Sequence, residues 1–143
     1  MTSPAVSNVA RIGRAILMDD EEDGFQQIAY YQAGIGAEAE STWYSKLREG
    51  GLGVGLVSNI REAYGFICNN YDHGDEIYIT GFSRGAYTAR SVAGLIGKCG
   101  ILTKKGLDLF YEAFAFYENS DKKTCPVTEE ASHNSDTVHE KSS

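Results

Sequence analysis

Hydrophobic residues recur every three or four positions along four stretches of the chain. These stretches cover residues 3–16, 56–71, 84–99 and 107–117. Such spacing is typical of amphipathic helices, because an α-helix turns once every 3.6 residues. Ser3 and Pro4 favour a helix start near the N-terminus, since serine caps a helix and proline suits its first turn. The pattern therefore predicts four helices.

Two short apolar runs predict β-strands between the helices. Residues 27–31 contain Ile, Ala and two Tyr and lead into a glycine-containing loop, and residues 77–80 read Ile-Tyr-Ile-Thr before Gly81. Short β-branched and aromatic runs that end at glycine are typical of buried parallel strands. Helices alternating with such strands predict an α/β fold, with parallel strands and flanking helices.

The helix predicted over residues 84–99 is rich in small side chains. We expect its buried face to carry the residues that follow a helical period, which are Ala86, Ala89, Ala93 and Ile96. Three glycines leave little bulk between helix and sheet, namely Gly85, Gly94 and Gly97. This composition predicts close packing of the helix on the sheet.

Composition restricts the classes of partner. The 143 residues are 42% hydrophobic and 11% aromatic, which suits one folded domain and excludes a chain that is disordered throughout. The formal net charge is -7, from 13 Lys and Arg against 20 Asp and Glu. A chain with this excess of acid has no basic field for a phosphate backbone, so we expect no nucleic acid partner.

No membrane segment or secretory signal is evident. Spanning a bilayer needs about 20 apolar residues, and Arg11 and Arg14 interrupt the N-terminal stretch. The default localisation is therefore cytoplasmic. The three cysteines, Cys68, Cys99 and Cys125, are too few and too far apart for a disulfide framework or a zinc site, so we expect reduced thiols.

Two segments with the residue types of ligand loops are interpreted as turns. The acidic run 19–23 precedes Gly24, a pattern typical of a solvated turn and not of a metal site. The four glycines in residues 50–55 are not followed by the Lys-Ser/Thr pair of a phosphate loop, and Leu56 replaces the last glycine of a dinucleotide loop. We therefore expect neither a metal nor a cofactor.

One pentapeptide carries candidate chemistry. Gly81-Phe82-Ser83-Arg84-Gly85 fits the Gly-x-Ser-x-Gly nucleophile elbow, the sharp strand-to-helix turn that exposes a catalytic serine. Here Ser83 is the candidate nucleophile, and the backbone N–H of Arg84 is a candidate oxyanion-hole donor at a helix N-terminus. Gly81 and Gly85 would remove side chains that collide in the turn. The alternative is a structural turn in which Ser83 caps the helix.

Three longer segments carry a family resemblance. Residues 30–36, 59–67 and 75–90 resemble the Tle1-like catalytic domain of type VI secretion phospholipase effectors, also called the DUF2235 domain. The resemblance covers residues 3–118 and implies an α/β-hydrolase with a Ser-Asp-His triad that acts on lipid or other ester substrates. It assigns Ser83 to the nucleophile position and Arg84 to the adjacent oxyanion donor. Residues 119–143 are polar, and we expect a disordered tail.

Other parts of the family pattern are not identifiable. No first strand ending in Asp-Gly-Thr precedes Ser3, and His73 falls on the loop at the opposite end of the second predicted strand from Ser83. His133 and His139 fall in the polar tail, where Asp136-Thr137-Val138 echoes the family's acid motif by coincidence. We therefore expect a partial hydrolase domain that is inactive alone, and whether the chain is an enzyme stays open.

A second hypothesis is a non-catalytic, hydrolase-like interaction module or gene remnant. The edge of a sheet that lacks its first strand presents unpaired backbone groups, which favour pairing with another chain. In this hypothesis the protein associates with itself or with a different partner through that edge.

Overall fold

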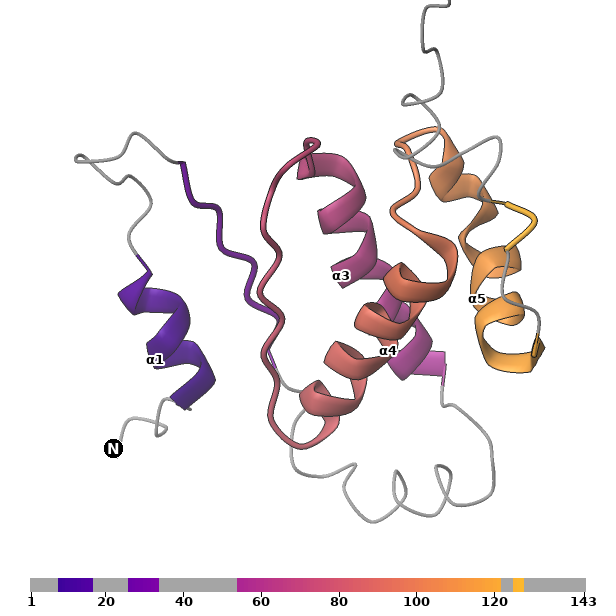
Figure 1. Ribbon diagram of the computed structural model, residues 1–143. Helices are drawn as coiled ribbons and strands as arrows, with labels where there is room; N and C mark the ends of the chain where they lie inside the picture. Colours follow the sequence, from indigo (N-terminus) through magenta and orange to yellow (C-terminus); the bar gives the residue numbers. More distant parts are fainter. Residues whose placement is uncertain (1–7, 17–25, 34–53, 122–124, 128–143) are drawn as a thin grey trace, which may run out of the picture.

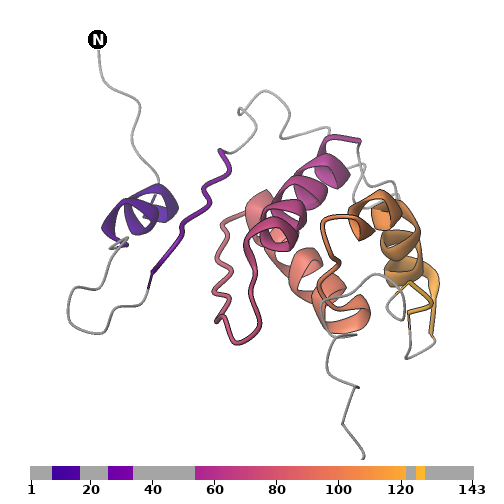
Figure 2. The same ribbon diagram turned by 90° about the horizontal axis from the view of Figure 1, so that it is seen from above.

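The structure of the protein is a computed structural model that describes residues 8–16, 26–33, 54–121 and 125–127. Its helices are α1 (Asn8–Ala15), α3 (Val54–Asn70), α4 (Arg84–Cys99), the short 3-10 helix η2 (Gly106–Leu109) and α5 (Phe110–Asn119). Helix α4 contacts both α3 and α5, as Figure 1 and the view from above in Figure 2 show. The predicted helices are confirmed within these ranges, with a 3-10 turn in place of the start of the last one.

The predicted α/β fold is wrong for the part of the chain that the structure describes. These residues form helices and extended segments, and they contain no strand. The predicted strands 27–31 and 77–80 lie in extended segments on the same side of α3 (Figures 1 and 2). An extended segment becomes a strand only where a neighbouring backbone completes its hydrogen-bond ladder. The apolar composition of these segments therefore predicted their extended backbone correctly, but the predicted pairing into a sheet is wrong.

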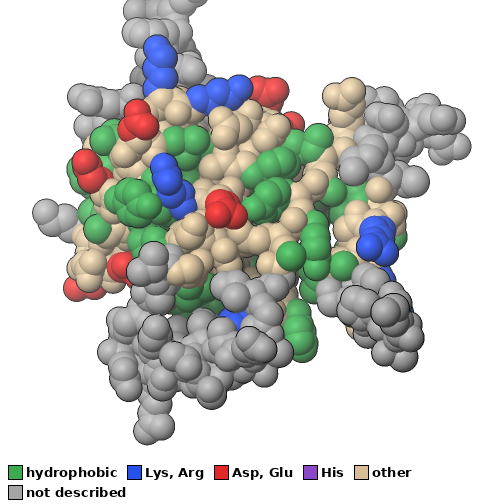
Figure 3. All heavy atoms as spheres, turned by 180° about the vertical axis from the view of Figure 1, so that it is seen from behind, with side chains coloured by type: hydrophobic (Ala, Val, Ile, Leu, Met, Phe, Trp, Pro, Cys, Tyr) green, Lys and Arg blue, Asp and Glu red, His purple; other side chains and the backbone are tan. Residues whose placement is uncertain are grey.

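The same segments are exposed, although the sequence predicts burial. Apolar side chains that reach the surface here are Ile28, Tyr30, Tyr31, Ile77, Tyr78 and Phe82. Exposed apolar side chains also lie among the polar ones on the rear face in Figure 3. Side chains hold segment 26–33 against α3: the Tyr30 ring stacks on Phe66 at 4.8 Å, and Gln32 Nε2 donates to Glu62 Oε2 at 3.2 Å. The segment is therefore attached by side-chain contacts.

The core lies where α3, α4 and α5 meet. Its buried members are Leu56, Ile60, Tyr64, Cys68, Val92, Leu95, Cys99, Ile101, Leu102, Phe110, Ala113, Phe114, Cys125 and Val127. The predicted apolar stripe of α3 supplies the first three of them, which confirms the helical period of that stretch. Among the described residues, no helix is both long and apolar enough to span a bilayer.

The predicted inner face of α4 is wrong. Its buried residues include Val92, Leu95 and Cys99, whereas Ala93 is exposed and Ala86 is half-buried. The reason is that α4 packs between two helices, so these neighbours select the larger side chains for burial. A face of alanines would suit close approach to a sheet, which the described residues do not form.

Two residues of α4 fix its contact with α5. A Cβ built on Gly94 would lie 2.7 Å from Cε2 of Tyr117, so the Tyr117 ring occupies the space that a side chain would need. The Lys98 ammonium donates to the carbonyl oxygens of Tyr117, at 3.2 Å, and Ser120. A cation at these carbonyls also suits the negative end of the α5 dipole. Lys98 therefore caps the C-terminus of α5.

The three cysteines are buried and free, which confirms unpaired thiols. Burial raises the pKa of the Cys68 thiol to about 11. The pKa of the Cys99 thiol is raised to about 12, and burial is the main cause there too. Cys125 and Val127 come from the segment predicted as a polar tail, and both are buried in the core. The rest of that tail, residues 128–143, lies outside the described residues, so its predicted disorder stays a prediction.

One buried hydroxyl joins α3 to the chain that leaves α4. The Tyr64 hydroxyl donates to the Gly100 carbonyl at 2.9 Å and accepts the Leu102 N–H at 3.1 Å. The side chain is fully buried, and burial is the main reason that its pKa is raised. Its ring also lies 5.9 Å from the Phe110 ring of α5, so this one residue of α3 contacts both α5 and the chain that leaves α4.

We expect Tyr64→Phe to lower the free energy of unfolding by about 1–3 kcal/mol, because a half-buried carbonyl and a buried N–H would lose their partner. Urea denaturation followed by circular dichroism measures this change. Tyr78→Phe is the matched control, since the Tyr78 hydroxyl is bonded to Glu76 on the surface and its loss should cost less than about 0.5 kcal/mol. Equal losses in the two variants would show that the buried Tyr64 hydroxyl contributes no more to stability than a surface one.

Candidate functional site

The candidate site is the turn that enters α4. The extended segment 75–82 ends at this turn, and α4 begins at Arg84, at the lower end of the helix in Figure 1. Two backbone hydrogen bonds close it: Gly85 N–H donates to the Phe82 carbonyl at 2.9 Å, and Ala86 N–H donates to the Ser83 carbonyl at 3.0 Å. Ser83 therefore lies where the chain changes abruptly from extended to helical.

The backbone of Ser83 is strained. Its φ is 54° and its ψ is -121°, and it is the one non-glycine residue with positive φ in the described part of the chain. These angles are near the mirror image of an ordinary extended conformation, which glycine adopts freely and L side chains avoid. Backbone strain of this kind costs about 1–3 kcal/mol and is concentrated at functional sites.

The Ser83 side chain is exposed and makes no capping hydrogen bond to α4. Ser83 therefore occupies the N-cap position of α4 without the hydroxyl-to-backbone bond that the capping alternative requires. The first turn of α4 also contains no acidic side chain, so it adds no negative charge to the positive end of the helix dipole. The positive end of the α4 dipole therefore favours negative charge close to the Ser83 hydroxyl.

The two glycines of the pentapeptide differ in their surroundings. A Cβ on Gly81 would lie 2.2 Å from the carbonyl oxygen of Gly85 and 2.7 Å from the nitrogen of Ala86, closer than real atoms approach. A Cβ on Gly85 would meet no described heavy atom within 4 Å. The turn therefore requires glycine at position 81, because any side chain there would collide with the backbone. Position 85 has space for a side chain.

This difference predicts different outcomes for two alanine substitutions. Gly81→Ala should lower the free energy of unfolding by about 1–3 kcal/mol, because its Cβ collides with backbone that cannot rotate away. Gly85→Ala is the control within the same turn, and we expect it to be neutral or slightly stabilising, since alanine favours helix over glycine by about 1 kcal/mol. Thermal unfolding of both variants tests the assignment, and similar destabilisation by both would refute it.

Strain at position 83 predicts an unusual order of stabilities. Ser83→Gly should be more stable than Ser83→Ala by about 1–2 kcal/mol, because glycine adopts this backbone without strain and alanine does not. The same pair of substitutions at exposed Ser58, inside α3, is the control. There the alanine variant should be more stable than the glycine variant, because alanine favours helix. The same order at both positions would argue against strain at Ser83.

The described histidine is far from the turn. His73 is exposed and lies in the loop between α3 and segment 75–82, at the opposite end of that segment from Ser83, as the sequence predicts. His133, His139 and Asp136 lie outside the described residues, as do the acidic run 19–23 and the glycine loop 50–53. Among the residues that are described, no three His, Cys, Asp or Glu side chains group as metal ligands would.

A pocket between α4 and α5 was not predicted from the sequence. It has a volume of about 330 Å³ and is lined by Tyr87, Ser91, Phe114, Tyr117 and Glu118. Tyr87 and Ser91 are four residues apart in α4, which places them on one face of that helix. That spacing was a usable signal, but the contribution of α5 depends on tertiary packing.

The comparisons agree with the resemblance seen in the sequence. Residues 1–143 match a family of phospholipase effectors of the type VI secretion system. Within that class, the chain belongs to the Tle1-like catalytic domain family. It is also 32% identical over 115 residues to the uncharacterized protein YEL023C of Saccharomyces cerevisiae, covering 73% of this chain and 17% of that relative. The chain thus spans less than a fifth of this relative's length, and no solved structure matches it.

Proposed function

We propose that this chain carries the nucleophile of a serine-dependent hydrolase of carboxylic esters in lipids, with Ser83 as that nucleophile. The observation that carries the proposal is the strained backbone of Ser83 at the start of α4. A nucleophile elbow needs this strain because it projects the serine hydroxyl out of the turn. Membership of a phospholipase effector family supports a lipid as the substrate class.

The reaction follows from the position of the hydroxyl. Ser83 Oγ attacks the ester carbonyl carbon while its proton passes to a general base, and the carbonyl oxygen becomes an oxyanion. The Arg84 backbone N–H and the positive end of α4 stabilise that oxyanion. Its collapse breaks the ester bond and releases the protonated alcohol, and water then hydrolyses the acyl-serine to a carboxylic acid. In this proposal the base is a residue outside the described ranges.

The surroundings of Ser83 suit an apolar acyl chain. Phe82, the residue before it, is 79% exposed, and Tyr78 in the same extended segment is 84% exposed. Large exposed apolar side chains next to a polar reactive group are typical of sites that contact an apolar partner. These two side chains support a lipid ester more than a small polar ester as substrate.

A fluorophosphonate probe tests this proposal, because the probe reacts with an activated serine and not with ordinary hydroxyls. Labelling at Ser83 is expected if the chain supplies its own general base, and it would overturn the expectation that the domain is inactive alone. Mass spectrometry of the intact and digested protein measures the labelling. Ser83→Ala should abolish labelling and hydrolysis of a phospholipid substrate, whereas Ser58→Ala, on an exposed face of α3, should leave both unchanged. Circular dichroism of each variant is the control for folding.

Labelling that persists in Ser83→Ala would reject Ser83 as the nucleophile. An absence of labelling in the folded, unmodified chain would reject hydrolysis by this chain and favour a non-catalytic role. Labelling without phospholipid turnover, together with cleavage of a small soluble ester, would retain the nucleophile and reject the lipid substrate.

A further inference from the structure

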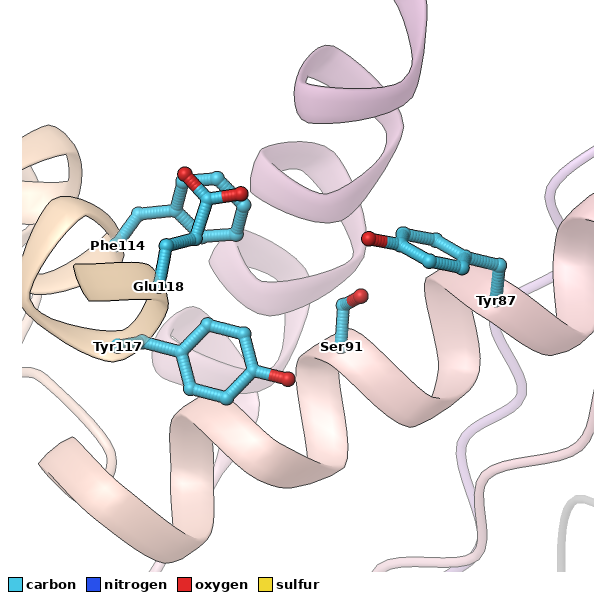
Figure 4. Close-up of a pocket in the computed structure, with 5 residues that line it drawn as sticks. All are labelled: Tyr87, Ser91, Phe114, Tyr117 and Glu118. Carbon is cyan, nitrogen blue, oxygen red and sulfur yellow. The ribbon is translucent and has the colours of Figure 1, made fainter. Parts of the chain in front are cut away.

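The pocket between α4 and α5 presents oxygen atoms and aromatic rings to one space. Figure 4 shows the hydroxyl groups of Tyr87, Ser91 and Tyr117 directed toward this space, with the Glu118 carboxylate beside the Phe114 ring. Its volume of about 330 Å³ lies at the lower end of the range for small-molecule sites. The pocket can therefore hold a small polar ligand.

Ser91 is the polar group that most requires a partner. Its side chain is only 5% exposed and lines the pocket, and its hydroxyl makes no hydrogen bond to any residue that the structure describes. A buried hydroxyl without a partner is unfavourable, so native structures supply one from protein, water or ligand. A ligand in the pocket with a hydrogen-bond donor would satisfy Ser91.

The other lining groups indicate the charge of that ligand. Glu118 contributes a carboxylate, and the rings of Tyr87, Phe114 and Tyr117 offer faces that attract cations. An anion would meet the carboxylate directly and the excess negative charge of the chain generally. Burial raises the pKa of the Glu118 carboxyl, and a bound cation would counteract that effect by stabilising the charged form.

Hydrogen-bond capacity selects one kind of cation. A primary ammonium has three N–H donors, and the lining contains three acceptors from two helices: buried Ser91 Oγ, the hydroxyl of half-buried Tyr117 and the carboxylate of Glu118, which lies at the exposed edge. A quaternary ammonium has no N–H and would leave Ser91 without a partner. We propose that this pocket binds the primary ammonium group of an ethanolamine-type ligand, either free or as a lipid headgroup. The lipid form rests on the proposed function, and binding of the free ligand does not.

Position along α4 is consistent with a headgroup site. At about 1.5 Å of rise per residue, Tyr87 and Ser91 lie roughly 6 and 12 Å along the helix axis from Ser83. A headgroup held in the pocket would therefore lie within reach of Ser83 for an ester elsewhere in the same lipid molecule. This geometry connects the pocket to the turn at Ser83 through one rigid helix.

The test is a titration of the full chain with ethanolamine and with choline, followed by heteronuclear NMR. We expect ethanolamine to bind at least about tenfold more tightly than choline, and Ser91→Ala and Glu118→Gln each to weaken ethanolamine binding by about tenfold. Tyr117→Phe keeps the ring and should cause a smaller loss. Glu112→Gln, at an exposed position in the first turn of α5, is the matched control and should bind as the unmodified chain does.

Each outcome decides the proposal. Tighter binding of choline, equal binding in Ser91→Ala and Glu118→Gln, or no shifts for residues of α4 and α5 would overturn it. Vesicles of phosphatidylethanolamine compared with phosphatidylcholine then distinguish the two sources: preference for the former supports a lipid headgroup, and binding of free ethanolamine alone limits the site to the soluble ligand. Because these readouts need no turnover, they can succeed in Ser83→Ala, where the proposed hydrolysis fails.

Discussion

The buried hydroxyl of Tyr64 is the interaction on which the arrangement of the helices depends. It joins α3 to both a carbonyl and an N–H of the chain that leaves α4, inside a core with little other polar contact. A hydrogen bond made away from water resists distortion more than one at the surface, because neither group has an alternative partner. The C-terminal end of α4 is thereby fixed relative to α3, and α5 packs against both.

A fixed α4 explains how its other end can hold a strained residue. An unfavourable backbone conformation persists only where contacts with the surrounding structure outweigh its conformational cost. At Ser83 these contacts come from both sides. The helix α4 follows it, and Gly81 before it packs on the backbone of Gly85. The free energy stored at the turn is thus balanced by the core, whose first member on α4, Val92, lies about 14 Å from Ser83 along the helix axis on the basis of helical rise.

The sequence predicted the helices well and their environment poorly. Periodicity is a local property, so Leu56, Ile60 and Tyr64 marked the buried stripe of α3 correctly. Strand pairing and the choice of buried face depend on neighbours that one sequence does not specify, which is why segments 27–31 and 77–80 and the inner face of α4 were predicted incorrectly.

The candidate site divides in the same way. The turn at Ser83 could be predicted because a pentapeptide encodes its steric requirements, and Gly81 meets the requirement that the pattern implies. The role assigned to the backbone of Arg84 remains a prediction. The pocket could not be predicted, because Ser91 and Glu118 are separated by 27 positions and meet only after α4 and α5 have packed.

The close contact between Gly94 and Tyr117 has a consequence for how this fold can diversify. Because the Tyr117 ring fills the space where a side chain at position 94 would stand, that residue sets how deeply the ring can settle and so how wide the pocket is. A single methyl group there would displace the Tyr117 ring and its hydroxyl, while leaving Ser91 and Glu118 unchanged. A substitution at this one backbone position could thus change the width of the pocket and the position of one of its polar groups together.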